Sequence, residues 1–372
     1  MDPRMVDSHV PAELPAYVYD IGALGRHLAG VREKTRGVEL FYAAKANPDA
    51  RVLETIAPLV DGIEVASGGE LEHVRAVLPD ARLAFGGPGK TDTELGLALR
   101  EAERVHVESP HELRRLAAFR RDADVLLRVN LAGERAGVAL AMSGPFGMDP
   151  EAMDACREML RGAPWVRLRG VHAHLASGLD ADAAVRQSRE VLGWARPWLE
   201  KAGVESPEIN LGGGMGVDYA APGSRFDWTS YGRRVADLAL PGETLRIEPG
   251  RAISVYCGWY VTRVLDVKRA HGAWYAVLLG GTHHLRTPVT KNHDQPFTVL
   301  PRDEPGPSVE DAPVTLVGQL CTPKDVFARD VPVTRLAVGD VVAFSMAGAY
   351  AWNISHHDFL MHPKPAFHYV TS

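Results

Sequence analysis

VELFYAAKANPDARVLETIAPLVDGIEVASGGELEHVRAVLPDARLAFGG, residues 38–87, is the stretch that decides the fold. Its three short apolar runs, VELFYAAKA, GIEVAS and RLAFGG, are typical of buried strands, because they are brief and are bounded by Gly, Asp or Pro. Two stretches with helical spacing of apolar residues, RVLETIAPLV and GELEHVRAVL, separate these runs. Strands that alternate with helices in this way predict a parallel sheet.

The same alternation continues through the first 250 residues. Five further strand-like runs are RVHVES from Arg104, DVLLRVN from Asp124, RLRGVHAHLA from Arg167, EINLGGG from Glu208 and TLRIEPG from Thr244. Eight strands, most of them followed by a helical pattern, predict an α/β fold of the (β/α)₈ TIM barrel type. A doubly wound open sheet would give the same local pattern, so the alternation alone leaves that fold open.

The pattern changes after Arg251. The runs YCGWYVTRVLDVKRA, WYAVLLGG, PVTLVGQLC and VVAFSMAG are rich in β-formers and have no helical repeat between them. We therefore predict a barrel over 22–250, an all-β domain over 251–372, and an N-terminal segment over 1–21 that joins the β-domain through the strand-like PAYVYD. The Pro- and acid-rich stretch 301–313 is expected to be an exposed, mobile loop.

Composition excludes several classes of protein. The net charge of −6 gives no reason to expect nucleic acid as a partner, and no apolar run approaches membrane-spanning length. The acidic N-terminus lacks the basic start and apolar core of a signal peptide. Cys156, Cys257 and Cys321 are odd in number and widely spaced, which disfavours a disulfide framework or a zinc site. We expect a cytoplasmic protein without a metal.

Chemistry in a (β/α)₈ barrel lies at the C-terminal ends of the strands. The polar or Gly-rich residues at those ends are Lys45 after the first strand, His174 and Ser177 after the sixth, Gly212–Gly214 after the seventh, and Glu248 and Arg251 after the eighth. Each alone has a simpler interpretation as a solvated Lys, a hydrogen-bonding His, a tight turn or a surface ion pair. Together, on one rim, they predict an active site.

These motifs resemble those of one enzyme family. FYAAKAN, GIEVASGGEL, HAHLASG, LGGGMGVDY, IEPGR, CTPKD and GAY occur in the order seen in the fold-type III pyridoxal 5′-phosphate (PLP) decarboxylases. That family includes diaminopimelate, ornithine and arginine decarboxylases. The resemblance covers nearly the whole chain, and it implies an alanine racemase-like barrel followed by a C-terminal β-domain, in agreement with the strand pattern.

The resemblance implies a PLP site on the barrel rim. Lys45 would hold the cofactor as a Schiff base, and Glu248 would face the pyridine nitrogen and keep it protonated, so that the ring acts as an electron sink. His174 would stack on the ring face. The residues implied at the phosphate or its loop are Ser177, Gly212, Gly213, Gly214, Gly250, Arg251 and Tyr350. A Gly run suits a phosphate because its N–H groups are uncrowded, and we expect it at a helix N-terminus.

Cys321 matches the family's acid, which returns a proton to Cα after CO₂ is lost, and a thiol can donate at neutral pH. In the family this Cys comes from the second subunit of a head-to-tail dimer, together with the Asp that matches Asp325. The resemblance therefore implies an obligate homodimer with two shared active sites. Taken alone, Cys321 has the simpler interpretation of a buried, inert thiol.

The residue after Cys321 departs from the family pattern. Diaminopimelate and ornithine decarboxylases place an acid there, which binds the distal amine of the substrate, whereas this chain has Thr322. Losing that acid removes a charge-assisted contact worth about 1.5–3 kcal/mol, which disfavours a diamine-type substrate. Pro145, where relatives usually have a Lys, is a second departure, and the sequence offers no explanation for it.

The segment 280–297, GGTHHLRTPVTKNHDQPF, points the same way. Diamine decarboxylases carry an acid-bearing loop near this position, whereas here the loop holds His283, His284, Arg286, Lys291 and His293. Such a cluster suits carboxylates, and the alternative is that these groups are supporting or surface residues. The residues expected to contact the substrate are His283, His284, Arg286, Thr322 and Asp325.

Thr322 and the HHLR loop resemble a siderophore-pathway branch of the family, whose substrate is an amino acid condensed with citrate, such as citryl-diaminopropionate. We therefore predict α-decarboxylation of a carboxylate-rich L-amino acid. A diaminopimelate-like or carrier-bound glutamyl decarboxylase is the alternative within the same chemistry. An amino-acid racemase is disfavoured by Glu248, because alanine racemases place Arg at the pyridine nitrogen. A non-catalytic regulator is disfavoured by the intact Lys45 and Cys321.

Overall fold

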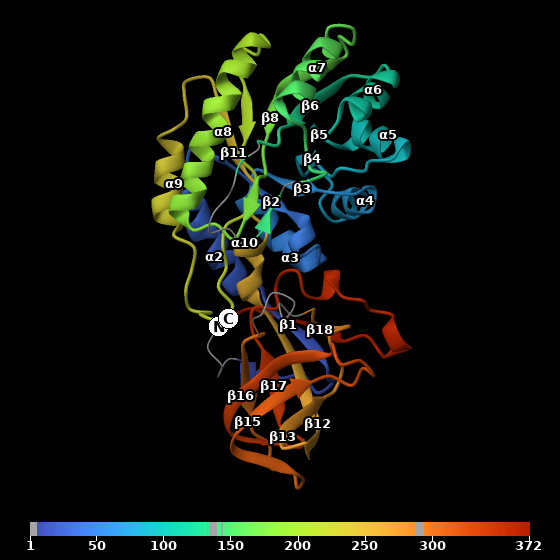
Figure 1. The fold of residues 1–372 in the computed structure, drawn as a ribbon, viewed down its shortest axis with the longest axis vertical. Coiled ribbons are helices and arrows are strands. Elements are labelled where there is room, and N and C mark those ends of the chain that lie inside the picture. The colour runs from blue at the N-terminus through green and yellow to red at the C-terminus, as the bar shows by residue number, and fades with distance from the viewer. Residues whose placement is uncertain (1–5, 132, 134–139, 143, 287–293) are drawn as a thin grey trace. The chain divides into compact units, whose positions relative to one another are not determined.

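The computed structural model describes residues 6–131, 133, 140–142, 144–286 and 294–372. The chain divides into two compact units (Figure 1). The first, the barrel unit, comprises residues 27–217 and 226–253. The second, the β unit, comprises residues 1–26, 218–225 and 254–372.

The barrel unit is built on eight parallel strands that close into a ring in the order β10-β11-β2-β3-β4-β5-β6-β8. The strands are β2 (Glu39–Ala43), β3 (Gly62–Val65), β4 (Leu83–Phe85), β5 (Arg104–Val107), β6 (Ala123–Arg128), β8 (Val166–His172), β10 (Glu208–Asn210) and β11 (Thr244–Ile247). They are the eight runs that the sequence pattern indicated. The predicted TIM barrel is therefore confirmed, and the open sheet is excluded.

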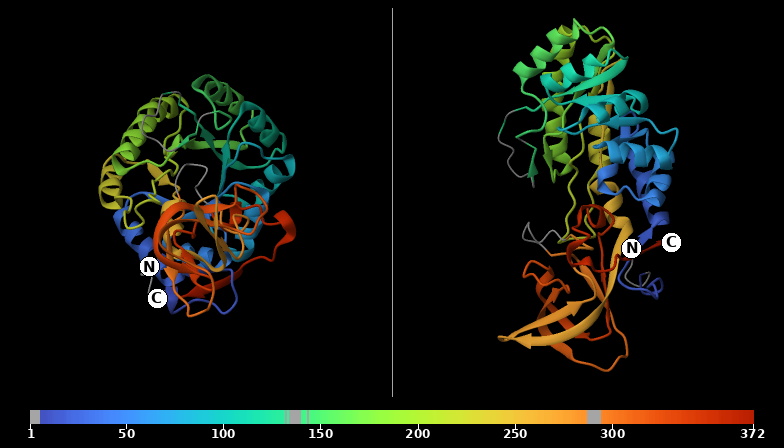
Figure 2. Two further views of the ribbon diagram at one scale, coloured as in Figure 1. Left: turned by 60° about the horizontal axis from the view of Figure 1, so that its bottom comes forward. Right: turned by 90° about the vertical axis from the view of Figure 1, so that its right-hand side faces the viewer.

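Helices lie outside the ring of strands (Figure 2). They are α2 (Ile21–Lys34), α3 (Ala50–Ile56), α4 (Gly68–Val77), α5 (Asp92–Glu101), α6 (Pro110–Ala118), α7 (Pro150–Leu160), α8 (Ala181–Lys201) and α9 (Trp228–Ala236); the short α10 (Arg251–Ser254) follows β11. Side chains cap several of their N-termini, which would otherwise leave N–H groups unpaired. Ser67 and Ser109 each accept the N–H three residues on, and Thr91 forms a capping box with Glu94.

A charged cluster lies at the N-terminal end of the barrel strands. Arg246, which is 1% exposed, donates to Glu39 at the start of β2 and pairs with Glu208 at the start of β10. Its guanidinium also lies 4.2 Å from the centroid of the Phe41 ring. These contacts neutralise the buried guanidinium of Arg246. They lie at the N-terminal end of the barrel strands, where residues contribute to stability and not to catalysis.

The β unit contains an eight-stranded sheet. Its strands are β1 (Ala16–Asp20), β12 (Gly258–Ala270), β13 (Ala273–Leu278), β14 (Phe297–Leu300), β15 (Ser308–Val317), β16 (Val326–Ala337), β17 (Val341–Phe344) and β18 (Ala366–Val370). β1, within the strand-like PAYVYD, pairs antiparallel with β12 and parallel with β18. Val18, Trp259 and Val341 belong to a buried apolar cluster of this sheet.

One expectation about this unit is wrong. The stretch 301–313 was expected to be a loop, but from Ser308 onward it belongs to β15, which pairs with β16. Only residues 301–307 lack regular structure. In the described part of the chain, no helix combines the length and apolar character needed to cross a membrane.

Candidate active site

Lys45 lies directly after β2, in the short 3₁₀ turn η1 (Ala44–Ala46). Its Nζ donates to the carboxylate of Glu64 on β3, at 2.9 Å from Oε2 and 3.2 Å from Oε1. The Lys45 side chain is 47% exposed and that of Glu64 only 5%. The amine is therefore accessible at the C-terminal end of the strands, where it is held by one buried acid.

Glu64 is a residue that the sequence analysis missed. Burial raises the pKa of its carboxyl group, and the adjacent Lys45 ammonium opposes that rise. The sequence does contain a signal, because Glu64 is a charged residue between Ile63 and Val65 in a strand that the structure buries. An acid in such a position requires a partner, and the partner is Lys45.

The Gly run follows β10 and is packed too tightly for side chains. A Cβ on Gly213 would lie 2.4 Å from the backbone oxygen of Glu248, and one on Gly214 would lie 2.2 Å from that of Ala176. Gly212 and Gly214 also have positive φ angles of 70° and 93°, which favour glycine. The expected helix N-terminus is absent here, because no helix begins between this run and α9 at Trp228.

His174 and Ser177 lie beside the Gly run. The backbone N–H of Gly213 donates to His174 Nδ1 at 3.1 Å, and that of Gly212 donates to the side chain of Asn210 at 2.9 Å. Ser177 Oγ lies 3.5 Å from His174 Nε2. Burial, with the positive charges of Lys45 and Arg128, lowers the pKa of His174 to about 3. The ring is therefore neutral at physiological pH.

Glu248 follows β11 and is 7% exposed. Its Oε1 accepts a hydrogen bond of 2.6 Å from Asn210 Nδ2, another contact that the sequence analysis missed. Gly250 brings this segment against the turn of Lys45, since a Cβ there would lie 2.8 Å from the Cβ of Ala46. Arg251, three residues after Glu248, is the first residue of α10. Lys45, Glu248 and Arg251 thus lie on adjoining strand ends.

The remaining predicted residues belong to the β unit. Cys321 is exposed, followed by Thr322. Asp325 is 2% exposed, and its carboxylate accepts the backbone N–H groups of Thr282 at 2.6 Å and Leu320 at 2.8 Å. Tyr350 has a positive φ angle of 50°. Asp325 therefore holds the backbone around Cys321 in place.

The HHLR segment differs from the cationic cluster that we expected. His283 and His284 are buried, and burial lowers their pKa values to about 4 and about 3. Both rings are therefore neutral near pH 7. His284 lies 3.1 Å from Tyr260 Oη and 2.9 Å from the Pro363 oxygen. Arg286 is exposed and carries the segment's charge, whereas the predicted Lys291 and His293 lie outside the described residues.

Comparison with known proteins identifies the family. The model of the pyridoxal binding domain of pyridoxal-dependent decarboxylases matches residues 21–255. The chain belongs to the pyridoxal-dependent decarboxylases. It is a PLP-dependent carboxy-lyase, as the motifs implied.

Curated relatives match along almost the whole chain. The chain is 43% identical to the 2-[(L-alanin-3-ylcarbamoyl)methyl]-2-hydroxybutanedioate decarboxylase of Staphylococcus aureus, over 95% of this chain and 94% of the relative. It is 30% identical to the L-glutamyl-[BtrI acyl-carrier protein] decarboxylase of Niallia circulans, over 95% and 88%. It is also 30% identical to the diaminopimelate decarboxylase of Bacteroides thetaiotaomicron, over 93% and 92%.

Solved structures share the fold. The diaminopimelate decarboxylase of Helicobacter pylori complexed with L-lysine superposes with a TM-score of 0.87, at 22% identity, over 98% of this chain and 94% of that one. The arginine decarboxylase of Paramecium bursaria Chlorella virus gives a TM-score of 0.84 at 20% identity, over 99% and 98%.

The barrel residues fit PLP. Lys45 offers an accessible primary amine, which can condense with an aldehyde. Glu248 offers a buried carboxylate that can accept a hydrogen bond from a protonated ring nitrogen. Gly213 and Gly214 carry no side chain because any Cβ there would collide with neighbouring backbone oxygens. The N–H groups of Gly212 and Gly213 already donate to Asn210 and His174. The barrel rim thus combines an amine that can anchor the cofactor, a buried acid and a Gly run.

Proposed function

We propose that this enzyme decarboxylates an L-amino acid whose side chain ends in carboxylates, of the citryl-diaminopropionate type. The name of the Staphylococcus aureus relative describes such a molecule, in which an L-alanine unit is joined through a carbamoyl group to a 2-hydroxybutanedioate. The free α-amino and carboxyl groups of that unit are the reacting end, and the dicarboxylate is the distal end. Identity of 43% along nearly both whole chains supports the same substrate class here.

The observation that carries the proposal is the chemistry of the loop around Cys321. Segment 318–325 contains a single acid, Asp325, since Thr322 occupies the position after Cys321. The Asp325 carboxylate accepts two backbone N–H groups and is 2% exposed. The Asp325 carboxylate is therefore occupied by hydrogen bonds that stabilise its own loop. A distal ammonium group would find no accessible carboxylate in this segment.

Arg286 supplies the complementary charge in this proposal. It is exposed, and its backbone N–H is fixed by a 3.0 Å hydrogen bond to Ser355 Oγ. A guanidinium can bind a carboxylate through two parallel hydrogen bonds. The neutral His283 and His284 support the segment from the interior, and Arg286 binds the distal carboxylates of the substrate.

The barrel residues have the following roles in this proposal. PLP, when bound, supplies an electron sink for the electrons of the Cα–carboxylate bond. Lys45 anchors the cofactor, and Glu64 accepts hydrogen bonds from the Lys45 ammonium whenever that amine is free. Glu248 would hold a proton on the ring nitrogen, and neutral His174 would pack on the ring. Cys321 would return a proton to Cα.

A homodimer with shared sites and a cytoplasmic location belong to the same proposal. The family resemblance implies that Cys321 serves the Lys45 site of the partner subunit. Exposure of the Cys321 thiol in the single chain is compatible with that role. The location follows from the reducing compartment that three cysteines outside any disulfide favour.

A substrate panel tests the reaction. Initial rates of CO₂ release are measured with citryl-diaminopropionate, diaminopimelate, ornithine and carrier-bound glutamate. We expect kcat/KM for the citryl compound to exceed that of the others by at least about tenfold, the equivalent of one charge-assisted contact. Equal rates with diaminopimelate, or no turnover of the citryl compound, would contradict the substrate assignment.

An Arg286→Ala variant tests the recognition of the distal carboxylates. KM for the citryl compound should rise about five- to tenfold with little change in kcat, because an exposed pair contributes about 1 kcal/mol. Arg329→Ala, which removes another exposed Arg of the β unit, is the matched control. The same loss of affinity for a neutral amino-acid substrate would show that Arg286 is structural.

Mixed subunits test the shared site. Lys45→Ala and Cys321→Ala homodimers should each have little activity. When the two variants are unfolded, mixed in equal amounts and refolded, about one quarter of the sites should contain both wild-type residues if each site uses Lys45 from one subunit and Cys321 from the other. Recovery of about one quarter of the wild-type activity is expected, and no recovery would contradict shared sites.

A further inference from the structure

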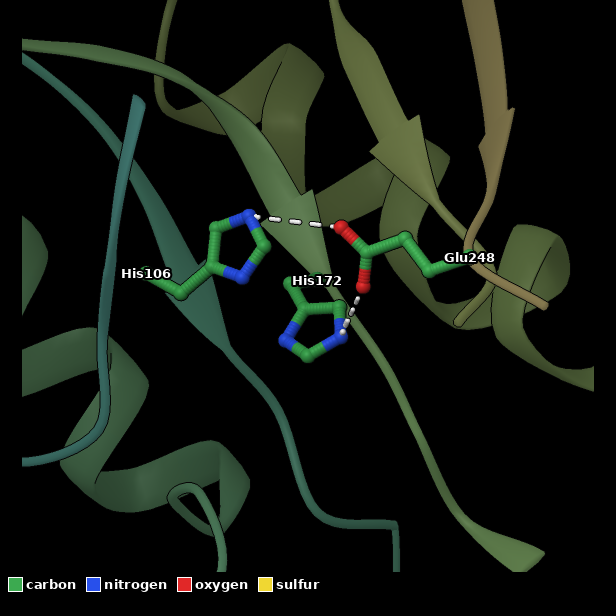
Figure 3. Close-up of side chains that lie close together, drawn as sticks. All are labelled: His106, His172 and Glu248. Atoms are coloured by element: carbon green, nitrogen blue, oxygen red, sulfur yellow. Dashed lines mark ion pairs between the residues drawn. The ribbon is translucent and has the colours of Figure 1, made fainter. Parts of the chain in front are cut away.

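Two histidines inside the barrel face Glu248 (Figure 3). His172 is the last residue of β8, and its Nε2 lies 3.4 Å from Glu248 Oε2. His106 comes from β5, and its Nε2 lies 3.9 Å from Glu248 Oε1. The two imidazole rings stack with their centroids 4.3 Å apart at an interplanar angle of 24°. Two strands, β5 and β8, thus bring the histidines to the carboxylate that follows β11.

Both imidazoles are buried polar groups. His106 is 0% and His172 4% exposed, and within the described residues none of their four ring nitrogens has a hydrogen-bond partner. Burial lowers the pKa of each ring well below its usual value, and nearby positive charges add to the effect, although Glu248 opposes it at His106. Each ring is therefore neutral, with one N–H donor and one acceptor nitrogen.

Neutral donors are the groups that can orient a carboxylate without neutralising it. Asn210 already donates to Glu248 Oε1 at 2.6 Å and adds no charge. The His172 Nε2 distance exceeds a normal N–H···O hydrogen bond by only about 0.4 Å. A cationic side chain in the same place would compete with a protonated ring nitrogen for the charge of Glu248.

We propose that His106 and His172 are positioning residues, which orient the Glu248 carboxylate toward the pyridine nitrogen of PLP. This inference rests on the proposed role of Glu248. His172 acts on Oε2 across 3.4 Å, His106 acts more weakly on Oε1 across 3.9 Å, and the stacking of the two rings fixes their mutual orientation. Burying two imidazoles that form no hydrogen bond within the described residues destabilises a barrel interior, so a role in the site explains their presence better than packing does.

The test compares PLP with its 1-deaza analogue, which has C–H in place of the ring nitrogen. Dissociation constants for both compounds are measured by titrating the cofactor-free protein. His172→Phe keeps the ring stack and removes the N–H, and His172→Asn keeps a neutral donor. His111→Phe, which replaces an exposed His on α6, is the control. His106→Phe gives an independent measurement should the His172→Phe protein fail to fold.

We expect His172→Phe to weaken PLP binding about tenfold, while binding of the deaza analogue stays within twofold of wild type. His172→Asn should recover most of the loss, and His111→Phe should bind as wild type. The ¹⁵N chemical shift of the ring nitrogen in labelled, bound PLP should move in His172→Phe and return in His172→Asn. Equal loss for both compounds would show a merely structural role and overturn the inference.

Two further outcomes separate the possible failures. Wild-type protein that binds PLP and the deaza analogue equally would overturn the role of Glu248 itself. Wild-type protein that prefers PLP, with an unchanged preference in both Phe variants, would overturn only the role of the histidines. Metal analysis gives the last check, because a stoichiometric transition metal that is lost in His172→Phe would assign the three side chains to a metal instead.

Discussion

Gly213→Ala should weaken both the fold and cofactor binding. The new Cβ would lie 2.4 Å from the backbone oxygen of Glu248, whereas real Cβ atoms essentially never approach closer than 3.0 Å. The two segments must therefore separate by at least about 0.6 Å. The two segments cannot separate easily, because the Glu248 N–H donates to the Gly212 oxygen at 2.8 Å and the Gly213 N–H donates to His174.

The expected magnitude follows from this geometry. Overpacking against a fixed backbone costs about 1–3 kcal/mol, and Gly213 has no positive φ to add strain. We expect the free energy of unfolding to fall by about this amount. Because the displaced segment carries Glu248, the dissociation constant of PLP should also rise about tenfold or more. Urea unfolding and titration of the cofactor-free protein measure the two effects.

Gly193→Ala is the matched control for this substitution. Gly193 lies within α8, and a Cβ built there meets no atom within 4 Å. Replacing a helical Gly by Ala should stabilise the protein by about 0.5–1 kcal/mol and leave PLP binding unchanged. The reasoning is refuted if Gly213→Ala matches Gly193→Ala in both stability and PLP affinity.

Three other predictions concern single side chains. Cys321→Ala should lower kcat by about a hundredfold or more, as expected for loss of a general acid, and a fully active variant would remove Cys321 from that role. Lys90→Met should destabilise the protein by about 3–5 kcal/mol, because it leaves Glu112 buried without its 2.7 Å partner; Lys90→Met with Glu112→Leu should recover most of this loss in urea unfolding. His283 has a folded pKa of about 4, below the usual 6.5, so the unfolded chain takes up its proton first as the pH falls. Stability should drop between pH 6.5 and 4, by up to about 2 kcal/mol at pH 5, and His283→Asn should reduce that drop in unfolding curves at pH 7 and 5; an unchanged slope would contradict the burial argument.

Periodicity was sufficient to predict the barrel strands. A buried parallel strand forms a continuous apolar run, and a helix between two such strands has a spacing of 3.6 residues, so each repeat is visible locally. The first half of β15 escaped this reasoning because prolines and acids dominate the residues before Val314, whereas its second half lies in the predicted run PVTLVGQLC. Pro313 of β15 lies opposite Pro332 of β16, and such a pairing cannot be seen in either segment alone.

The site was only partly predictable, for a related reason. Lys45, Glu248 and the Gly run follow their strands, where any barrel places its chemistry, so their position in the sequence indicated their role. Glu64, His106 and Asn210 lie within strands. Alternate side chains of a strand point to opposite faces, and only closure of the barrel shows that these three point to the site.

Burial changes the electrostatic basis of the proposed specificity. The sequence suggested that a cluster of histidines with Arg286 and Lys291 would attract carboxylates, but a His ring buried at this depth loses its proton because the charged form is poorly solvated. His174, His283 and His284 are all neutral at physiological pH. Among the described residues of the HHLR segment, the positive charge at neutral pH then lies on Arg286. Selection of an anionic substrate would thus depend on one exposed guanidinium and on a Cys321 loop whose acid is already engaged, and it should be insensitive to protonation of these three histidines near neutral pH.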